Sequence, residues 1–182
     1  MESLRITIPN ELFSPAETRH YEGQLSMPVF KAGPDLYSFE QPLAWSADIT
    51  NTGDAFLVTG MVEGDATTSC ARCLEPTNVH CIGEIEGYFL LNGDVEADEE
   101  MEGDEFDVLP DDHTIDLVPL IQAALLVEVP LLPLCQDDCK GLCPQCGANL
   151  NEGPCGCAPA SEEEAAPGNP FAVLKDLNLE GE

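Results

Sequence analysis

The sequence predicts an α+β protein in which a mostly antiparallel β-sheet is packed by one core helix. Three observations indicate this class. Short β-prone stretches follow one another in the first half of the chain, at spacings that suit antiparallel neighbours better than the crossovers of a parallel sheet. A single apolar stripe of helical period comes after them. A short cysteine-rich tail then follows, with too few apolar residues for a core of its own.

Four stretches are expected to form the strands. Residues 4–8 and 43–49 alternate in character, as a half-buried strand does. Residues 55–64 are rich in β-forming side chains, and the polar run at 65–69 can extend that strand. Residues 79–91 can form one long strand with bends at its glycines.

The core helix is expected to run from Asp116, as its cap, through Glu128. Pro119 falls in the first turn, where a missing N–H costs little, and Pro130 ends the helix. The apolar positions follow the spacing i, i+3, i+4, i+7, i+8 and make one stripe: Leu117, Leu120, Ile121, Ala124 and Leu125. We expect this stripe to pack on the sheet.

Composition divides the chain further. Eleven acidic residues and no basic residue lie between positions 94 and 112. Such a run is expected to be a disordered or mobile loop; the alternative is an acidic mimic that holds a basic ribosomal or nucleic-acid-binding protein. The expected parts are a β-rich body at 1–92, an acidic loop at 93–113, the core helix and its exit at 114–134, a zinc-binding tail at 135–157, a linker at 158–170 and a short docking helix at 171–182.

The charge balance excludes several kinds of partner. The chain has 6 Lys and Arg against 35 Asp and Glu, a formal net charge of −29. Nucleic-acid binding depends on basic side chains that neutralise phosphates, so direct RNA binding is not expected. An anionic membrane surface is excluded for the same reason. The charge is therefore consistent with a basic partner or with none.

The cysteines predict a metal site. Six of the nine cysteines lie between positions 135 and 157, and the first residues have neither the basic nor the apolar region of a secretory signal. We therefore expect a cytoplasmic protein whose cysteines bind metal rather than form disulfides. The C-P-x-C-G form of residues 143–147 is that of a zinc knuckle. The expected zinc ligands are Cys135, Cys139, Cys143 and Cys146, with Cys155 and Cys157 as alternates.

Four thiolates leave no open position on the ion, so the expected Zn²⁺ is structural rather than catalytic. Free thiols in a flexible tail and an iron–sulfur cluster are the alternatives, and the cluster lacks its usual spacings. Cys70 and Cys73 form a separate pair around Arg72. That pair is open to three interpretations: a turn between two strands, a redox dithiol, or half of a second metal site.

The sequence contains no G-x-S-x-G, P-loop or dinucleotide fingerprint. We therefore expect no enzyme and no small-molecule substrate. A hydrolase acting on rRNA would need carboxylate metal ligands in a fixed geometry, which a mobile loop at 94–112 would not provide.

Several motifs together resemble the YceD-like family, the large ribosomal RNA subunit accumulation proteins. In order along the chain they are CARCLEP at 70–76, IDL at 115–117, EVPLLPLC at 128–135, DCKGLCPQCGANLN at 138–151 and NPFAVLKDL at 169–177. The first forty residues match that family only loosely.

The resemblance implies a bacterial cytoplasmic factor that supports the accumulation or processing of 23S rRNA in the large ribosomal subunit. With the charge of −29, it favours action through a basic ribosomal or rRNA-processing protein. The resemblance also makes Arg72, Leu74 and Glu75 candidates for the partner contact. The alternative function is a redox- or zinc-responsive regulator that uses Cys70 and Cys73.

Overall fold

The computed structural model describes residues 3–91 and 106–157, which fall into two compact units, Met1–Cys139 and Lys140–Glu182. The expected linker at 158–170 and docking helix at 171–182 lie outside the described residues, as do residues 93–105 of the expected acidic loop. The elements in chain order are β1 (Arg5–Thr7), the 3₁₀ helix η1 (Asn10–Phe13), β2 (Thr18–Leu25), β3 (Val29–Ala32), β4 (Asp35–Phe39), β5 (Leu43–Asn51), β6 (Ala55–Ser69), β7 (Pro76–Leu90), β8 (Asp107–Val108), β9 (Thr114–Asp116) and α1 (Val118–Glu128).

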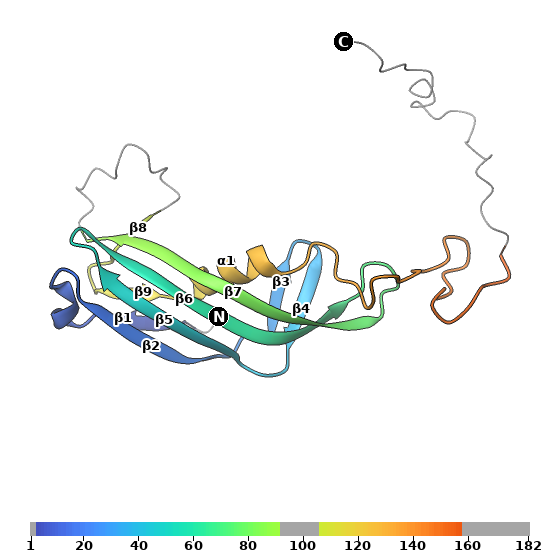
Figure 1. Ribbon diagram of the computed structural model, residues 1–182, viewed down its shortest axis with the longest axis horizontal. Coiled ribbons are helices and arrows are strands. Elements are labelled where there is room, and N and C mark those ends of the chain that lie inside the picture. The colour runs from blue at the N-terminus through green and yellow to red at the C-terminus, as the bar shows by residue number, and fades with distance from the viewer. Residues whose placement is uncertain (1–2, 92–105, 158–182) are drawn as a thin grey trace, which may run out of the picture. The chain divides into compact units, whose positions relative to one another are not determined.

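The first unit is a mostly antiparallel sheet with one α-helix, as the sequence predicts (Figure 1). The long strand β6 organises it. One edge of β6 pairs with β5 and then with β4, and its other edge pairs with β7 along the whole of both strands. β2 extends the sheet beyond β5, and β3 extends it beyond β4.

The core lies between the sheet and α1. Alternate residues of β5 are buried, as its period-2 pattern requires. Ile121, Ala124 and Leu125 of α1 are buried. The helix contacts β7 closely at two glycines, where a Cβ on Gly83 would lie 2.8 Å from the carbonyl carbon of Ala124 and one on Gly87 would lie 2.7 Å from a methyl of Leu120. Glycine is therefore what allows α1 to approach this strand.

The end of α1 is as expected, but its start is not: the N-cap residue is Leu117, which makes no side-chain capping bond, and the expected cap Asp116 is the last residue of β9. The Asp116 carboxylate accepts the backbone N–H of Val118 at 3.0 Å, at the start of the helix. After Glu128 the chain turns at Pro130, whose carbonyl accepts the hydroxyl of buried Tyr37 at 3.1 Å. That bond fixes the direction in which the chain leaves the helix.

One part of the expected acidic loop is ordered. Asp107 and Val108 form β8, which pairs in parallel with the end of β7. Leu109 is buried in the core, and its N–H bonds the carbonyl of Leu90 at 2.8 Å. The burial of Leu109 therefore fixes this end of the acidic segment against the core.

Candidate metal centres

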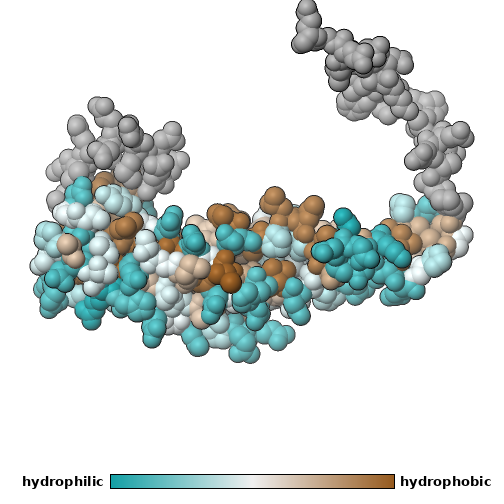
Figure 2. Space-filling model, viewed as in Figure 1, coloured by the Kyte–Doolittle hydropathy of each residue, from teal (hydrophilic) through white to brown (hydrophobic). Residues whose placement is uncertain are grey.

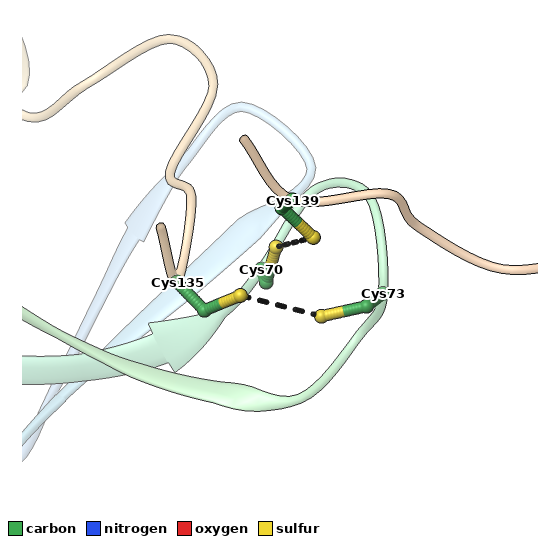
Figure 3. Close-up of side chains that lie close together, drawn as sticks. All are labelled: Cys70, Cys73, Cys135 and Cys139. Atoms are coloured by element: carbon green, nitrogen blue, oxygen red, sulfur yellow. Dashed lines mark hydrogen bonds between the residues drawn. The ribbon is translucent and has the colours of Figure 1, made fainter. Parts of the chain in front are cut away.

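Eight of the nine cysteines form two groups of four, one in each unit. Within each group the four sulfurs all lie within 4.8 Å of one another. Cluster A consists of Cys70, Cys73, Cys135 and Cys139 (Figure 3), and cluster B consists of Cys143, Cys146, Cys155 and Cys157. None of the nine cysteines forms a disulfide. The ninth, Cys81, is buried in the hydrophobic core.

The first half of cluster A is the turn that joins β6 to β7. The N–H of Leu74 donates to the carbonyl of Cys70 at 3.0 Å, and the N–H of Cys70 donates to the carbonyl of Glu75 at 2.8 Å. Leu74 has φ of 63°, a left-handed conformation that costs a residue with a Cβ. The turn brings the sulfurs of Cys70 and Cys73 to the same side (Figure 3).

The second half of cluster A is the chain that leaves α1. The N–H of Ala71 donates to the carbonyl of Pro133 at 2.8 Å, which ties this segment to the β6–β7 turn. The guanidinium of Arg72 donates to the carbonyl of Cys139 at 2.9 Å. In consequence the Cys139 sulfur lies 3.8 Å from that of Cys70, and the Cys135 sulfur lies 3.6 Å from that of Cys73.

Cluster B repeats the same turn. The N–H of Gly147 donates to the carbonyl of Cys143 at 2.8 Å, and the N–H of Cys143 donates to the carbonyl of Ala148 at 2.8 Å. Gly147 has φ of 73°, close to that of Leu74. The C-x-x-C pairs at 70–73 and 143–146 are therefore two copies of one knuckle, each completed by two cysteines from further along the chain.

The backbone of each knuckle polarises its first thiol. The amide of Cys73 bonds the Cys70 sulfur and lowers the pKa of this thiol to about 6, although burial opposes that shift. The amides of Cys146 and Gln145 lower the pKa of Cys143 to about 6 in the same way. The neighbouring sulfurs of each group raise the pKa of Cys135 and of Cys157 to about 12. Thiols with a raised pKa keep their protons in the absence of metal. A cation that binds the four sulfurs would displace these protons.

The structure corrects the expected ligand set. The sequence analysis placed Cys135, Cys139, Cys143 and Cys146 in one centre, but the first two belong to cluster A and the last two to cluster B. Cys155 and Cys157, expected only as alternates, complete cluster B. The physical reason is the pairing of β6 with β7, which places the 70–73 turn beside the exit of α1 and so brings its two thiols to Cys135 and Cys139.

Cys70 and Cys73 lie in a turn between two strands, as one of the three interpretations expects, and their sulfurs also lie beside those of Cys135 and Cys139. Of the three interpretations, the arrangement favours half of a second four-cysteine group. The signal for it was present in the sequence, since the C-x-x-C spacing of the knuckle occurs twice. The sequence analysis left this interpretation open and could not choose it, because no second pair of cysteines lies near positions 70–73 in the sequence.

The three residues named as partner contacts lie together on the knuckle of cluster A. The guanidinium of Arg72 bonds backbone carbonyls of the same unit. The side chain of Leu74 is 64% exposed, and Glu75 is also exposed. Contact of these residues with a partner stays a prediction.

Comparison with known proteins identifies the family. Residues 58–178 match the family model described as large ribosomal RNA subunit accumulation protein YceD. The chain belongs to the YceD family. This range contains both clusters and α1, and the family's description is that of an accumulation factor and not of an enzyme.

Several relatives are similar to this YceD family member. An uncharacterized protein of Mycobacterium tuberculosis is 32% identical over 148 residues, which cover 80% of this chain and 67% of that protein. The chloroplastic large ribosomal RNA subunit accumulation protein YCED homolog 1 of Zea mays is 28% identical over 69% of this chain and 52% of that protein. The Arabidopsis thaliana homolog 1 is 24% identical over 74% of this chain and 49% of that protein. No solved structure was found to match this chain.

Among the described residues, no helix is both long and apolar enough to span a membrane.

Proposed function

We propose that this protein is a non-enzymatic cytoplasmic factor that supports the accumulation or processing of large-subunit (23S) rRNA by binding a basic protein. The observation that carries the proposal is the match to the YceD family over residues 58–178. The net charge of −29 supports the nature of the partner, because so acidic a chain attracts a basic protein and repels RNA.

The positions of the basic residues support an indirect action on RNA. Within the described residues they lie on different elements: Arg5 on β1, Arg19 on β2 and Lys31 on β3. Arg72 bonds backbone carbonyls in its own unit. Lys140 belongs to the second unit. This spread of the described basic residues over separate elements supports an action on rRNA through a protein partner.

The proposed function is tested in cells depleted of the protein. The ratio of large- to small-subunit rRNA is expected to fall, because the large-subunit species is lost selectively. Subunit profiles from the same lysates are expected to show the same loss. Cells supplied with the wild-type chain are the control. An unchanged ratio would contradict the proposal and would favour the redox- or zinc-responsive regulator that uses Cys70 and Cys73.

We further propose that clusters A and B each hold one structural Zn²⁺. A Zn–S bond of about 2.3 Å in a tetrahedral site places two sulfurs about 3.8 Å apart. In cluster A the sulfurs of Cys70 and Cys139 lie 3.8 Å apart, and those of Cys73 and Cys135 lie 3.6 Å apart. Four thiolates suit a soft ion, and they leave no position for a substrate. Zinc in cluster A would join the β6–β7 turn to the exit of α1, and zinc in cluster B would supply the stability that a short segment cannot draw from a core.

Metal analysis of the purified protein tests this assignment. We expect about two Zn²⁺ per chain, and about one in the double variants Cys70→Ser/Cys73→Ser and Cys155→Ser/Cys157→Ser, because each removes half of one cluster. Cys81→Ala is the matched control, since this cysteine lies outside both clusters. A wild-type content of one zinc, or a loss of both ions from either double variant, would contradict two independent centres.

A further inference from the structure

Within the described residues, most of one edge of the strand β7 is unpaired. β6 pairs with β7 from Pro76 to Leu90. On the other edge, within the described residues, β8 pairs only with Phe89 and Leu90. An edge strand presents a row of backbone donors and acceptors that can pair with another chain. The edge from Pro76 to Tyr88 therefore offers the backbone groups to which an extended segment can add.

A groove runs between this edge and α1. On the helix side its lining is apolar, with Leu120, Ala123 and Val127. Val127 is 81% exposed, an unusual exposure for a valine next to a groove. Hydrophobic residues gather along the side of the unit where Figure 1 shows α1 (Figure 2). An apolar side chain from a partner would remove this surface from water.

The charged residues that border the groove are all acidic. Glu84 and Glu86 come from β7 and Glu128 from the end of α1, and each is exposed. The residues that line the groove include no lysine and no arginine. Electrostatic complementarity therefore requires a basic occupant.

The register of β7 decides how such an occupant would be patterned. Gly83 and Gly87 face α1, because a Cβ on either would contact the helix. Since successive residues of a strand point to opposite faces, Glu84 and Glu86 point to the face away from α1. A strand added at this edge would likewise turn alternate side chains toward the apolar side of α1 and toward the glutamates.

We propose that this groove binds an extended segment of a basic protein as an added strand, in which apolar residues that contact α1 alternate with Lys or Arg that pair with Glu84 and Glu86. This inference rests on the proposed function, and it names the surface and the kind of segment through which that partner would bind. Backbone hydrogen bonds to the β7 edge would give affinity, and the alternation would give selectivity.

Synthetic peptides test the pattern. The probe is a nine-residue peptide of alternating Lys and Val, and its control has the same composition with the lysines and valines in two blocks. Titration of the zinc-loaded protein is expected to give at least about fivefold tighter binding of the alternating peptide, because only that peptide satisfies both faces at once. Equal affinities would show that charge alone drives binding and would overturn the proposal.

Two double variants locate the site. Glu84→Gln/Glu86→Gln is expected to weaken the alternating peptide by about fivefold, the scale of two exposed ion pairs. Glu22→Gln/Glu63→Gln removes the same charge from exposed positions on β2 and β6 that do not line the groove, and it is expected to change the affinity by less than about twofold. Equal losses in the two variants would contradict binding in the groove.

Amide hydrogen exchange identifies the added strand directly. The amides of β7 between Pro76 and Tyr88 are expected to become protected when the alternating peptide binds, and protection confined to other strands would overturn the proposal. Protection that already grows with protein concentration in the absence of peptide would assign the edge to a second copy of the chain, which would also overturn it.

The same variants separate this inference from the proposed function. In depleted cells, full restoration of the rRNA ratio by Glu84→Gln/Glu86→Gln would reject the groove as the functional surface while the proposed function stands. A ratio that does not change on depletion would reject the proposed function, whatever the peptides do in solution.

Discussion

Leu74 carries a conformational cost that its counterpart in the second knuckle avoids. Both residues follow a C-x-x-C pair and have positive φ, 63° for Leu74 and 73° for Gly147. Glycine adopts this conformation freely, whereas a residue with a Cβ loses about 1 kcal/mol or more. The side chain of Leu74 is exposed, so its burial does not offset this cost. Stability therefore does not explain a leucine at this position, and its contact with a partner stays a prediction.

Exchanging the two residue types tests this conformational cost. Leu74→Gly is expected to raise the free energy of unfolding of the zinc-loaded protein by up to about 1 kcal/mol, with unchanged zinc content. The reverse change, Gly147→Leu, has room for its side chain and is expected to lower the stability of cluster B by about the same amount. Urea unfolding and metal analysis of both variants measure these effects. A loss of stability in Leu74→Gly would mean that the side chain supports the fold.

The ligand grouping shows why spacing alone could not settle the site. The sequence indicated a knuckle at 143–146 and a structural tetrathiolate zinc site. It could not choose the second pair, because closeness in the sequence favoured Cys135 and Cys139. Those two cysteines instead meet thiols 62 and 69 positions away. Only the pairing of β6 with β7 makes that contact, and such long-range pairing leaves no local signal.

At the scale of the elements, strands with one buried face were the predictable ones. β5, β6, β7 and α1 follow their periodicity closely. The strand β2 was not predicted, because nearly all its side chains are exposed or half-buried and its sequence shows no alternation. It is a strand because its backbone pairs with β5 from Thr18 to Leu25. β3 and β4 are short and were not predicted either.

The packing of α1 on β7 gives a prediction about two glycines. A methyl group at Gly83 would meet the backbone of α1, which can yield only if the helix moves, whereas one at Gly87 would meet the flexible end of Leu120. We expect Gly83→Ala to lower the free energy of unfolding by about 1–3 kcal/mol through overpacking. Gly87→Ala is expected to cost less, because rotation of Leu120 relieves the contact and alanine restricts the unfolded chain.

Urea unfolding of the two variants, both loaded with zinc, measures the difference. The comparison is internal, since both glycines lie on β7 and both contact α1. Equal costs, or a gain in stability for Gly83→Ala, would show that the helix is not fixed against the strand as described.

At the scale of the whole molecule, charge and groove make different contributions to binding. The net charge of −29 acts over a distance on a basic partner, whichever acidic residues carry it. The backbone edge of β7 and the apolar side of α1 act only after contact. The first contribution sets mainly how fast a partner arrives, and the second sets how long it stays.

Salt separates these two contributions. Raising ionic strength from about 0.05 M to about 0.5 M shortens the screening length from about 14 to about 4 Å. We expect the association rate of the alternating Lys–Val peptide to fall by at least about tenfold over this range, while the dissociation rate changes by less than about threefold. Stopped-flow measurements on the wild-type protein and both glutamate variants check this. Glu22→Gln/Glu63→Gln is expected to act only on association, and Glu84→Gln/Glu86→Gln on association and, by less than about threefold, on dissociation as well. A salt effect carried by the dissociation rate in all three proteins would mean that ion pairs, and not the strand edge and the apolar groove, hold the bound segment.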